Sequence, residues 1–481
     1  MYYPSLEEVR RLAGEGNLVP IYREVLADLE TPVSAYLKIN RGSGSFLLES
    51  VEGGERLARY SFLGTEPYLT LKAPPAPQAV KDPLISVERE LKKHRLVPVA
   101  GLPRFHGGAV GYLAYDAVQH FERLPSPEAD PLNLPEAVFL FTDTLLVFDH
   151  LRHKIKIVSH VHLDGNVEAS YKEAVDKIEE LASRLRQPLN PNEPAAKPPV
   201  IEGEGRFTSN FTPEQYEAVV ERAKEYIYAG DIIQVVPSQR LARRTNADPF
   251  DIYRALRTIN PSPYMFYLHL DDCYIVGASP ELLVRVEDGH IDYRPLAGTR
   301  RRGKDADEDQ VLEQDLLGDE KERAEHVMLL DLGRNDVGRV SIPGTVRVPN
   351  AMYIVRYSHV MHIESQVLGQ LRPDLSPMEA LRSCFPAGTL SGAPKIRAME
   401  IIAELEPEKR GPYGGAVGYF DFSGNLDTAI AIRTLVIKEG VAYSQAGGGI
   451  VADSVPSEEY QETLSKARAT LRAIDEAEQG L

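Results

Sequence analysis

Apolar residues follow two different periods along this chain, and each period predicts its own kind of element. Short apolar runs bounded by turn-forming residues predict β-strands. The runs of this kind are FLFTDTLLVFDH (139–150), KIKIVSHVHL (154–163), CYIVGAS (273–279), LLVRVED (282–288), AIAIRTLVIKEG (429–440) and VAYSQAGGG (441–449). They come in hairpin-like succession rather than in strict alternation with helices, so we expect an α+β fold with antiparallel sheets.

Three longer segments have the period of an amphipathic helix. In the first, 211–231, Thr212 is a good capping residue, Pro213 fits the first helical position and Gln215 completes a capping box. Gly230 ends this helix. The other two segments are KERAEHVMLLDLGRND (321–336) and DSVPSEEYQETLSKARA (453–469).

The two later helices each carry a pair of glutamates three residues apart, so each pair projects from one helix face. The pairs are Glu322 with Glu325 and Glu459 with Glu462, and Lys466 lies on the same face as Glu459. A single pair of this kind usually marks a solvated face. Two pairs brought together would suit a hard cation such as Mg²⁺, which takes oxygen ligands and leaves positions open for an anionic substrate.

A proline-rich stretch at 187–206, with five prolines and no apolar periodicity, predicts a linker or surface excursion between residues 1–186 and 207–481. The two regions look related, since GGAVGY occurs in both and 60–73 resembles 274–288 in the same order. We therefore expect two related halves.

Aligning Gly64 with Gly277 puts Tyr68 where the second half has Glu281. The first region also lacks any counterpart of the paired-glutamate helices. We interpret residues 1–186 as a supporting and regulatory region, and residues 207–481 as the catalytic region.

Composition narrows the class of protein. The 481 residues include 54 basic and 71 acidic side chains, a net charge of −17, which argues against a nucleic-acid partner. Cys273 and Cys384 lack the spacing of a metal site, so we expect a reducing cytoplasm. The N-terminus has no signal-peptide pattern, and no apolar stretch approaches the ~20 residues needed to cross a membrane.

Four glycine-rich motifs accompany the glutamate pairs: RPLAGTRRRG (294–303), AGTLSGAPK (387–395), YGGAVGY (413–419) and QAGGGIVADS (445–454). Together they resemble the chorismate-utilising enzymes, and most closely anthranilate synthase component I, over essentially the whole chain. The resemblance implies a large antiparallel β-sandwich with helices outside. It also implies a Mg²⁺-dependent lyase that converts chorismate and ammonia to anthranilate and pyruvate, the first committed step of tryptophan biosynthesis.

The resemblance assigns roles to individual residues. Glu325 and Glu462 would bind Mg²⁺ directly, with Glu322 and Glu459 nearby. Glu281 would protonate the departing hydroxyl, which requires a raised pKa, and His362 would serve the later elimination of pyruvate. The residues implied to contact chorismate are Gly298, Thr299, Thr389, Tyr413, Arg433, Gly447, Gly448, Gly449 and Lys466.

Two positions separate this chain from other members of the group. Gln234 lies where the water-adding relatives have a lysine base, and a neutral amide cannot deprotonate water. Ala297 lies where many aminodeoxychorismate synthases have a nucleophilic lysine, so direct attack by ammonia is implied. The open alternatives are aminodeoxychorismate synthase component I and a catalytically dead regulatory subunit that senses tryptophan.

Two further motifs, FLLES (46–50) and NPSPYMFYL (260–268), resemble a feedback site for L-tryptophan. The residues implied to line or adjoin it are Leu48, Glu49, Ser50, Pro263, Tyr264 and Met265. Neither cysteine lies in a glutaminase-like nucleophile motif, so ammonia would come from a separate glutamine amidotransferase subunit, component II. We therefore expect a hetero-oligomer.

Overall fold

The computed structural model describes residues 1–50, 59–75, 82–189, 207–357 and 360–481. Two large sheets dominate this part of the chain, and every strand pair in them is antiparallel, as predicted. The first sheet has the order β1 (Leu18–Leu26), β8 (Lys154–His162), β7 (Thr144–Asp149), β3 (Tyr60–Gly64), β2 (Ser45–Glu49), β12 (Tyr264–Leu270), β13 (Cys273–Ser279), β22 (Thr434–Lys438), β23 (Val441–Gly447), β11 (Ser238–Arg244) and β9 (Thr208–Ser209).

The second sheet packs against the first. Its order is β16 (Leu296–Arg301), β18 (Val360–Gln370), β15 (His290–Tyr293), β14 (Leu282–Glu287), β21 (Leu426–Ile430), β20 (Ala416–Asp421), β5 (Gly108–Leu113), β6 (Ala137–Thr142) and β4 (Leu69–Ala73), and β17 (Arg347–Arg356) pairs with β18. A separate two-stranded ladder joins β10 (Gln234–Val235) to β19 (Gly392–Ala393).

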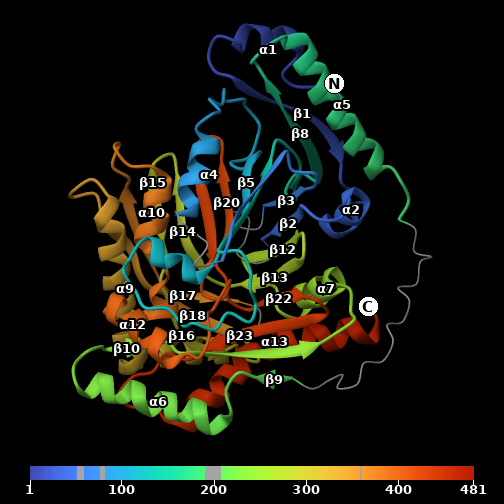
Figure 1. Ribbon diagram of the computed structural model, residues 1–481. Helices are drawn as coiled ribbons and strands as arrows, with labels where there is room; N and C mark the ends of the chain where they lie inside the picture. The colour runs from blue at the N-terminus through green and yellow to red at the C-terminus, as the bar shows by residue number, and fades with distance from the viewer. Residues whose placement is uncertain (51–58, 76–81, 190–206, 358–359) are drawn as a thin grey trace.

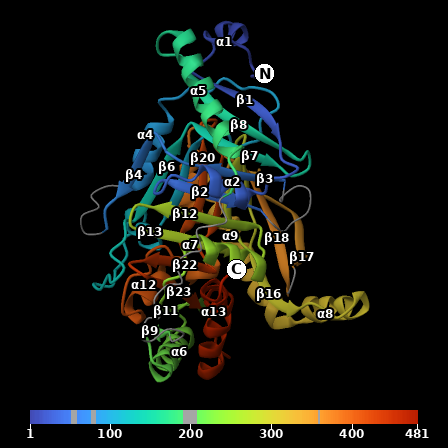
Figure 2. The ribbon, with the colours of Figure 1, turned by 90° about the vertical axis from the view of Figure 1, so that its right-hand side faces the viewer.

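Helices surround the sandwich, as Figure 1 shows. The helices are α1 (Leu6–Leu12), α2 (Pro32–Ile39), α4 (Pro83–Leu91), η1 (Tyr115–His120), α5 (Val167–Leu185), α6 (Pro213–Tyr228), α7 (Pro249–Ile259), α8 (Ala306–Gly318), α9 (Glu320–Val340), α10 (Pro377–Cys384), α11 (Gly388–Ser391), α12 (Lys395–Leu405) and α13 (Pro456–Gln479). The capping box predicted at Thr212 and Gln215 is formed at the start of α6. In the side view, α8 projects from the body beyond β16 (Figure 2).

The buried side chains form separate layers on either side of each sheet. One core cluster lies between the sheets, where Phe46 and Phe266 from the first sheet meet Val110 and Val417 from the second. Other clusters fill the space between each sheet and its outer helices. The alternation of side chains along each strand therefore supplies one face to the inner core and the other to the helices.

The expected relationship between the halves is visible in the strand register. The two GGAVGY motifs lie side by side in β5 and β20, where Gly111 pairs with Gly418. We call such a pairing of strands from the two halves a seam. The first sheet has an equivalent seam, because β2 pairs with β12. A Cβ added at Gly64 would lie 2.3 Å from the Phe46 ring, and one added at Gly277 would lie 2.2 Å from the Phe266 ring. The two matched glycines therefore make room for equivalent aromatic rings.

These strand pairs join the two regions of the chain. Residues 1–186 and 207–481 contribute strands to both sheets, so the two regions share one fold rather than forming two separate domains. Most of the proline-rich stretch, residues 190–206, lies outside the described residues. Across the described parts of the chain, no helix combines the length and the apolar character needed to span a membrane.

Candidate active site

Two helices from opposite layers bring the glutamate pairs together. Glu322 and Glu325 lie on α9, and Glu459 and Glu462 lie on α13. Burial raises the pKa of Glu325, and the charges of Glu322 and Glu462 raise it further. Burial likewise raises the pKa of Glu459, with a further contribution from Glu462. Because carboxylates on both helices influence one another, the two pairs form a single acidic cluster.

The acidic cluster has a carboxylate oxygen that could bind a cation. Among the described residues, Glu459 Oε2 is buried and has no hydrogen-bond partner, which is costly for a carboxylate unless another group balances it. In the described residues as they stand, no group of three or more His, Cys, Asp or Glu side chains is arranged to enclose a metal ion. An acidic cluster with raised pKa values and an unpartnered oxygen nevertheless fits a hard cation, because a bound cation would favour the charged forms.

Gln234 links the cluster to the glycine-rich turn. Its Nε2 donates to Glu325 Oε1 at 2.8 Å, while its own Oε1 is buried and forms no hydrogen bond within the part of the chain that the structure describes. A Cβ at Gly449 would lie 2.5 Å from Gln234 Nε2, and one at Gly448 would lie 2.7 Å from Glu459 Oε2. The glycines thus let the main chain pass within contact distance of the acidic cluster.

Two basic side chains, Lys466 and Arg433, lie next to the same glycine-rich turn. Lys466 Nζ forms an ion pair with Glu462 at 2.6 Å and donates to the Gly447 carbonyl oxygen at 2.8 Å. Arg433 donates through Nη1 to the Lys466 carbonyl oxygen. Its φ of +50° is a strained conformation for an arginine, of the kind that occurs at functional sites. Tyr413 is buried close by, where the charge of Arg433 acts on its hydroxyl.

Glu281 lies in the sharp step between β13 and β14 and is only 7% exposed. Thr389 of α11 donates a hydrogen bond from Oγ1 to Glu281 Oε1 at 2.9 Å. Burial is the largest influence on this carboxyl and raises its pKa to about 8. Glu281 is therefore mostly protonated at neutral pH, which is the state a general acid requires.

His362 on β18 is held in one orientation. Its Nδ1 lies 2.8 Å from the Gly298 carbonyl oxygen and 3.1 Å from Thr299 Oγ1. Burial lowers the pKa of this imidazole, so the ring is neutral. Since a carbonyl oxygen can only accept, Nδ1 carries the hydrogen and Nε2 keeps a lone pair that can accept a proton. Gly298 has a φ of +68°, which favours glycine there.

The charge of Lys466 connects these groups. It lowers the pKa values of Glu281, Glu325 and Glu459, although these residues come from three different elements. Arg433 similarly acts on His362. These interactions bring residues predicted for catalysis, substrate binding and metal binding together around one site.

A cavity of about 1350 Å³ lies between the two sheets. All six residues predicted for the feedback site line it: Leu48, Glu49, Ser50, Pro263, Tyr264 and Met265. The Glu49 carboxylate is already engaged, since Tyr253 donates to it at 2.5 Å and Arg257 at 2.9 and 3.2 Å. Glu49 therefore shapes the wall of the cavity rather than offering a free charge.

Sequence reasoning missed the polar side of this cavity. Arg285 donates to Asp427 Oδ2 at 2.8 Å and to Tyr264 Oη at 3.0 Å. Tyr264 in turn donates to Asp427 Oδ1 at 3.1 Å. The signal that could have found Arg285 is a charged residue inside the otherwise apolar run LLVRVED, because a charge in a buried strand needs a partner.

Comparison with known proteins identifies the class. Residues 44–472 match the family described as chorismate binding enzyme, and the chain belongs to this family. Two of its curated relatives have the same name. The anthranilate synthase component 1 of Acetivibrio thermocellus is 51% identical over 493 residues, covering 99% of both chains. The protein of the same name from Pseudomonas aeruginosa is 51% identical over 490 residues, again covering 99% of both.

Solved structures agree with this assignment. The crystal structure of anthranilate synthase component I from Streptococcus pneumoniae matches with a TM-score of 0.76 at 37% identity, covering 93% of this chain and 99% of that one. The menaquinone-specific isochorismate synthase of Escherichia coli has a TM-score of 0.72 at 20% identity, covering 98% and 99%, and so shares the fold. The resemblance noted in the motifs is confirmed, and aminodeoxychorismate synthase is not favoured.

Proposed function

We propose that this chain converts chorismate and ammonia to anthranilate, pyruvate and water. The observation that carries the proposal is the combination of a protonated carboxyl, Glu281, with the acidic cluster, both within reach of the Lys466 charge. Chorismate is a dianion that must lose a hydroxyl and then pyruvate. A site with a proton donor on one side and cation-binding carboxylates on the other suits that substrate.

Different residues of the chain would bind the substrate and transfer protons. Arg433, Tyr413 and the main chain at Gly447–Gly449 would hold the enolpyruvyl carboxylate, because they offer positive charge, a hydroxyl and closely approaching amides. Glu281 would donate its proton to the departing hydroxyl, which leaves as water. The neutral His362 would accept a proton at Nε2 while pyruvate is eliminated.

Mg²⁺ is part of this proposal. Glu325 and Glu462, with Glu322 and Glu459 beside them, would hold the ion, which supplies a positive charge to neutralise the ring carboxylate. Ala297 is buried on β16 and has no nucleophile, so ammonia would add directly to the ring. Gln234 would keep Glu325 in place without activating water for attack.

The proposal also covers the source of ammonia and the cellular compartment of the protein. A glutamine amidotransferase subunit would deliver ammonia, because Cys273 and Cys384 are both buried, and burial raises the pKa of both thiols. Two free thiols also suit a cytoplasmic protein.

The isolated chain should therefore form anthranilate from ammonium but not from glutamine. The fraction present as NH₃ rises with pH, whereas the protonated fraction of Glu281 falls as pH rises through its pKa of about 8. We expect a rate maximum on the alkaline side of neutrality, measured by anthranilate fluorescence with Mg²⁺ and ammonium. Equimolar pyruvate should appear; product without pyruvate, or glutamine-dependent turnover by the pure chain, would contradict the proposal.

We further propose that L-tryptophan binds in the cavity between the sheets and inhibits the reaction. Because Ser50 lies before the proline-rich stretch and Tyr264 after it, a ligand that touches both would favour one arrangement of the two halves. No catalytic role assigned above involves Ser50.

Ser50→Phe should leave the rate near that of the parent and raise the inhibitory tryptophan concentration about 10-fold or more, since extra bulk in a filled pocket typically costs about 1–3 kcal/mol. Inhibition curves at matched chorismate concentration provide the measurement. Ser43→Phe is the matched control, because Ser43 is exposed and outside the cavity. Equal inhibition of Ser50→Phe and the parent would remove the feedback proposal without affecting the catalytic one.

A further inference from the structure

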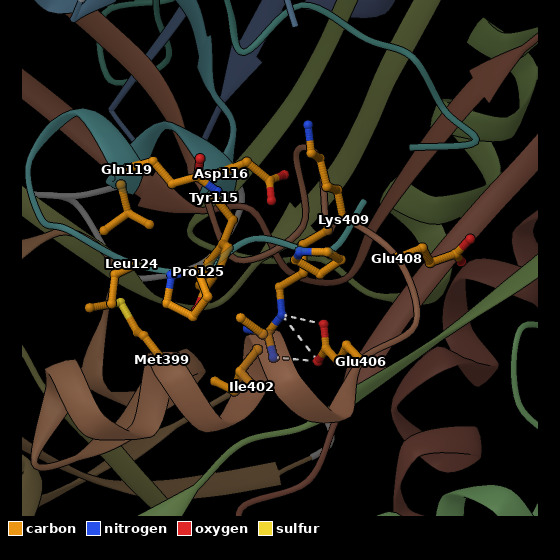
Figure 3. A pocket seen from close by; sticks show the side chains of 14 residues that line it. Tyr115, Asp116, Gln119, Leu124, Pro125, Met399, Ile402, Glu406, Glu408 and Lys409 are labelled. Atoms are coloured by element: carbon orange, nitrogen blue, oxygen red, sulfur yellow. Dashed lines mark hydrogen bonds and ion pairs between the residues drawn. The ribbon is translucent and has the colours of Figure 1, made fainter. Parts of the chain in front are cut away.

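Arg410 is a charged residue with almost no access to solvent. It follows α12 and is only 2% exposed, and its guanidinium forms an ion pair with Glu406 at 2.6 Å. Figure 3 shows Glu406 and Tyr115, with dashed lines marking the interactions of the Glu406 carboxylate. The pair is expensive to bury, so its remaining hydrogen bonds must be satisfied by the surrounding structure.

Those remaining bonds go to the segments that carry active-site residues. Arg410 Nη1 donates to the Leu390 carbonyl oxygen at 2.7 Å, and Leu390 is the neighbour of Thr389 on α11. Arg410 Nη2 donates to the Val236 carbonyl oxygen at 2.6 Å, two residues after Gln234. One side chain therefore fixes the main chain next to two of the residues that hold the catalytic carboxylates.

Glu406 extends the same network to the glycine-rich turn. It accepts hydrogen bonds from Ser238 N at 2.7 Å and from Ser238 Oγ at 2.8 Å. Ser238 Oγ also accepts from Gln445 Nε2 at 2.8 Å, and Gln445 lies on β23 just before the three glycines. The rings of Tyr115 and Tyr413 lie 4.5 and 5.6 Å from the guanidinium carbon, which adds cation–π contacts.

Among the described residues, the cavities that Arg410 lines are too small for a ligand. The adjacent cavity measures about 20 Å³, enough for about one water molecule, and Tyr115 Oη beside it has no partner among the described residues. Asp116, at the other side of this cavity, accepts from Gly411 N at 2.7 Å. The contacts of Arg410 are therefore made with the protein itself. Its charged side chain holds Glu406 and the main chain at Leu390 and Val236.

We propose that Arg410 is a positioning residue for the reaction: it holds α11 and the segment after β10 so that Thr389 reaches Glu281 and Gln234 reaches Glu325. This inference rests on the proposed function. It differs from a purely structural role in one respect: the two segments that it clamps touch the two carboxylates on which the chemistry depends. Losing the clamp would leave those carboxylates in place but lengthen their hydrogen bonds.

Arg410→Lys is the first test. An ammonium keeps the charge next to Glu406, but a point charge cannot match the planar fork that reaches Glu406, Leu390 and Val236 at once. We expect kcat to fall about 10- to 100-fold, since a displacement near 1 Å can cost that much.

A pH profile separates positioning from simple weakening of the fold. Thr389 lowers the pKa of Glu281, and the other charged groups that act on Glu281 are Glu364 and Lys466. If α11 moves, the Thr389 bond is lost and the pKa of Glu281 rises, so the alkaline limb of kcat should shift to higher pH. Thr389→Val should shift the limb in the same direction, which provides the benchmark.

Hydrogen exchange gives a readout that needs no substrate. Arg410→Lys should speed exchange of the amides in 234–238 and 387–393 while leaving the sheets protected. Arg184→Lys is the control: Arg184 is another buried arginine, paired with Glu66 and Glu180 on the opposite side of the fold. It should give parental kcat and no change of exchange in those two segments.

The possible outcomes distinguish failure of the proposed function from failure of the positioning role of Arg410. A parent and an Arg184→Lys variant that both fail to make anthranilate would refute the proposed function, whatever Arg410 does. An active parent with Arg410→Lys at parental kcat, or reduced kcat with an unmoved alkaline limb and unchanged exchange, would overturn the positioning role. If Arg410→Lys does not fold, Glu406→Gln tests the same clamp from the other side, with the same expected shifts.

Discussion

Replacing Glu281 with glutamine should lower kcat about 10²- to 10⁴-fold, the usual contribution of a general acid. The amide has nearly the same shape as the protonated carboxyl but cannot give up a proton to the departing hydroxyl. The parent should show an alkaline limb near pH 8, because burial raises the pKa of Glu281 to about 8. The residual activity of the variant should lack that limb, as measured by anthranilate formation across the pH range.

Stability provides an independent check on the same carboxyl. The pKa of Glu281 is raised from 4.5 in the folded protein, so the fold binds its proton more tightly than the unfolded chain does. The free energy of unfolding should therefore fall as pH rises from 4.5 through 8, and Glu281→Gln should remove this loss. Parental kcat in Glu281→Gln would refute the assignment.

Replacing Glu325 with glutamine should lower the rate at least about 100-fold at limiting Mg²⁺, since the charge stabilisation from a bound metal is worth several kcal/mol. The same change should raise the melting temperature without metal at alkaline pH. The reason is that burial and two neighbouring carboxylates raise the pKa of Glu325, so its charged form weakens the fold as pH rises above the unfolded value.

Thermal melting with and without Mg²⁺ tests this second prediction apart from turnover. The parent should gain stability from Mg²⁺, and Glu325→Gln should gain much less. Glu458→Gln removes an exposed glutamate from the first turn of α13 and should behave like the parent in both measurements. A Mg²⁺-dependent rise in melting temperature that is the same in Glu325→Gln as in the parent would exclude this carboxylate from the metal site.

The periodic parts of this structure could be predicted because local sequence determines them. Short apolar runs bounded by turn-forming residues predicted the strands, and the capping residues at Thr212 and Gln215 predicted the start of α6. The repeated motif also indicated that the halves are related. What it could not indicate is that Gly111 and Gly418 pair directly, since the period of a strand says nothing about which distant strand lies beside it.

The site was predicted less evenly. The two glutamate pairs and the run of three glycines, taken together with the family resemblance, pointed to the acidic cluster and the turn. Glu49 lines the cavity with the other predicted feedback residues, and its carboxylate is held by Tyr253 and Arg257. Arg410 was missed altogether, because its importance comes from two carbonyl oxygens that are distant in sequence.

The seams at β2–β12 and β5–β20 also have a consequence for synthesis of the chain on the ribosome. Strands β2 and β5 emerge early, but their partners β12 and β20 emerge only after the proline-rich stretch and, for β20, close to the end of the chain. Until then the first half presents two open strand edges, which readily pair with other chains. Productive folding therefore depends on protecting those edges during translation, and premature termination would leave an aggregation-prone half-sandwich.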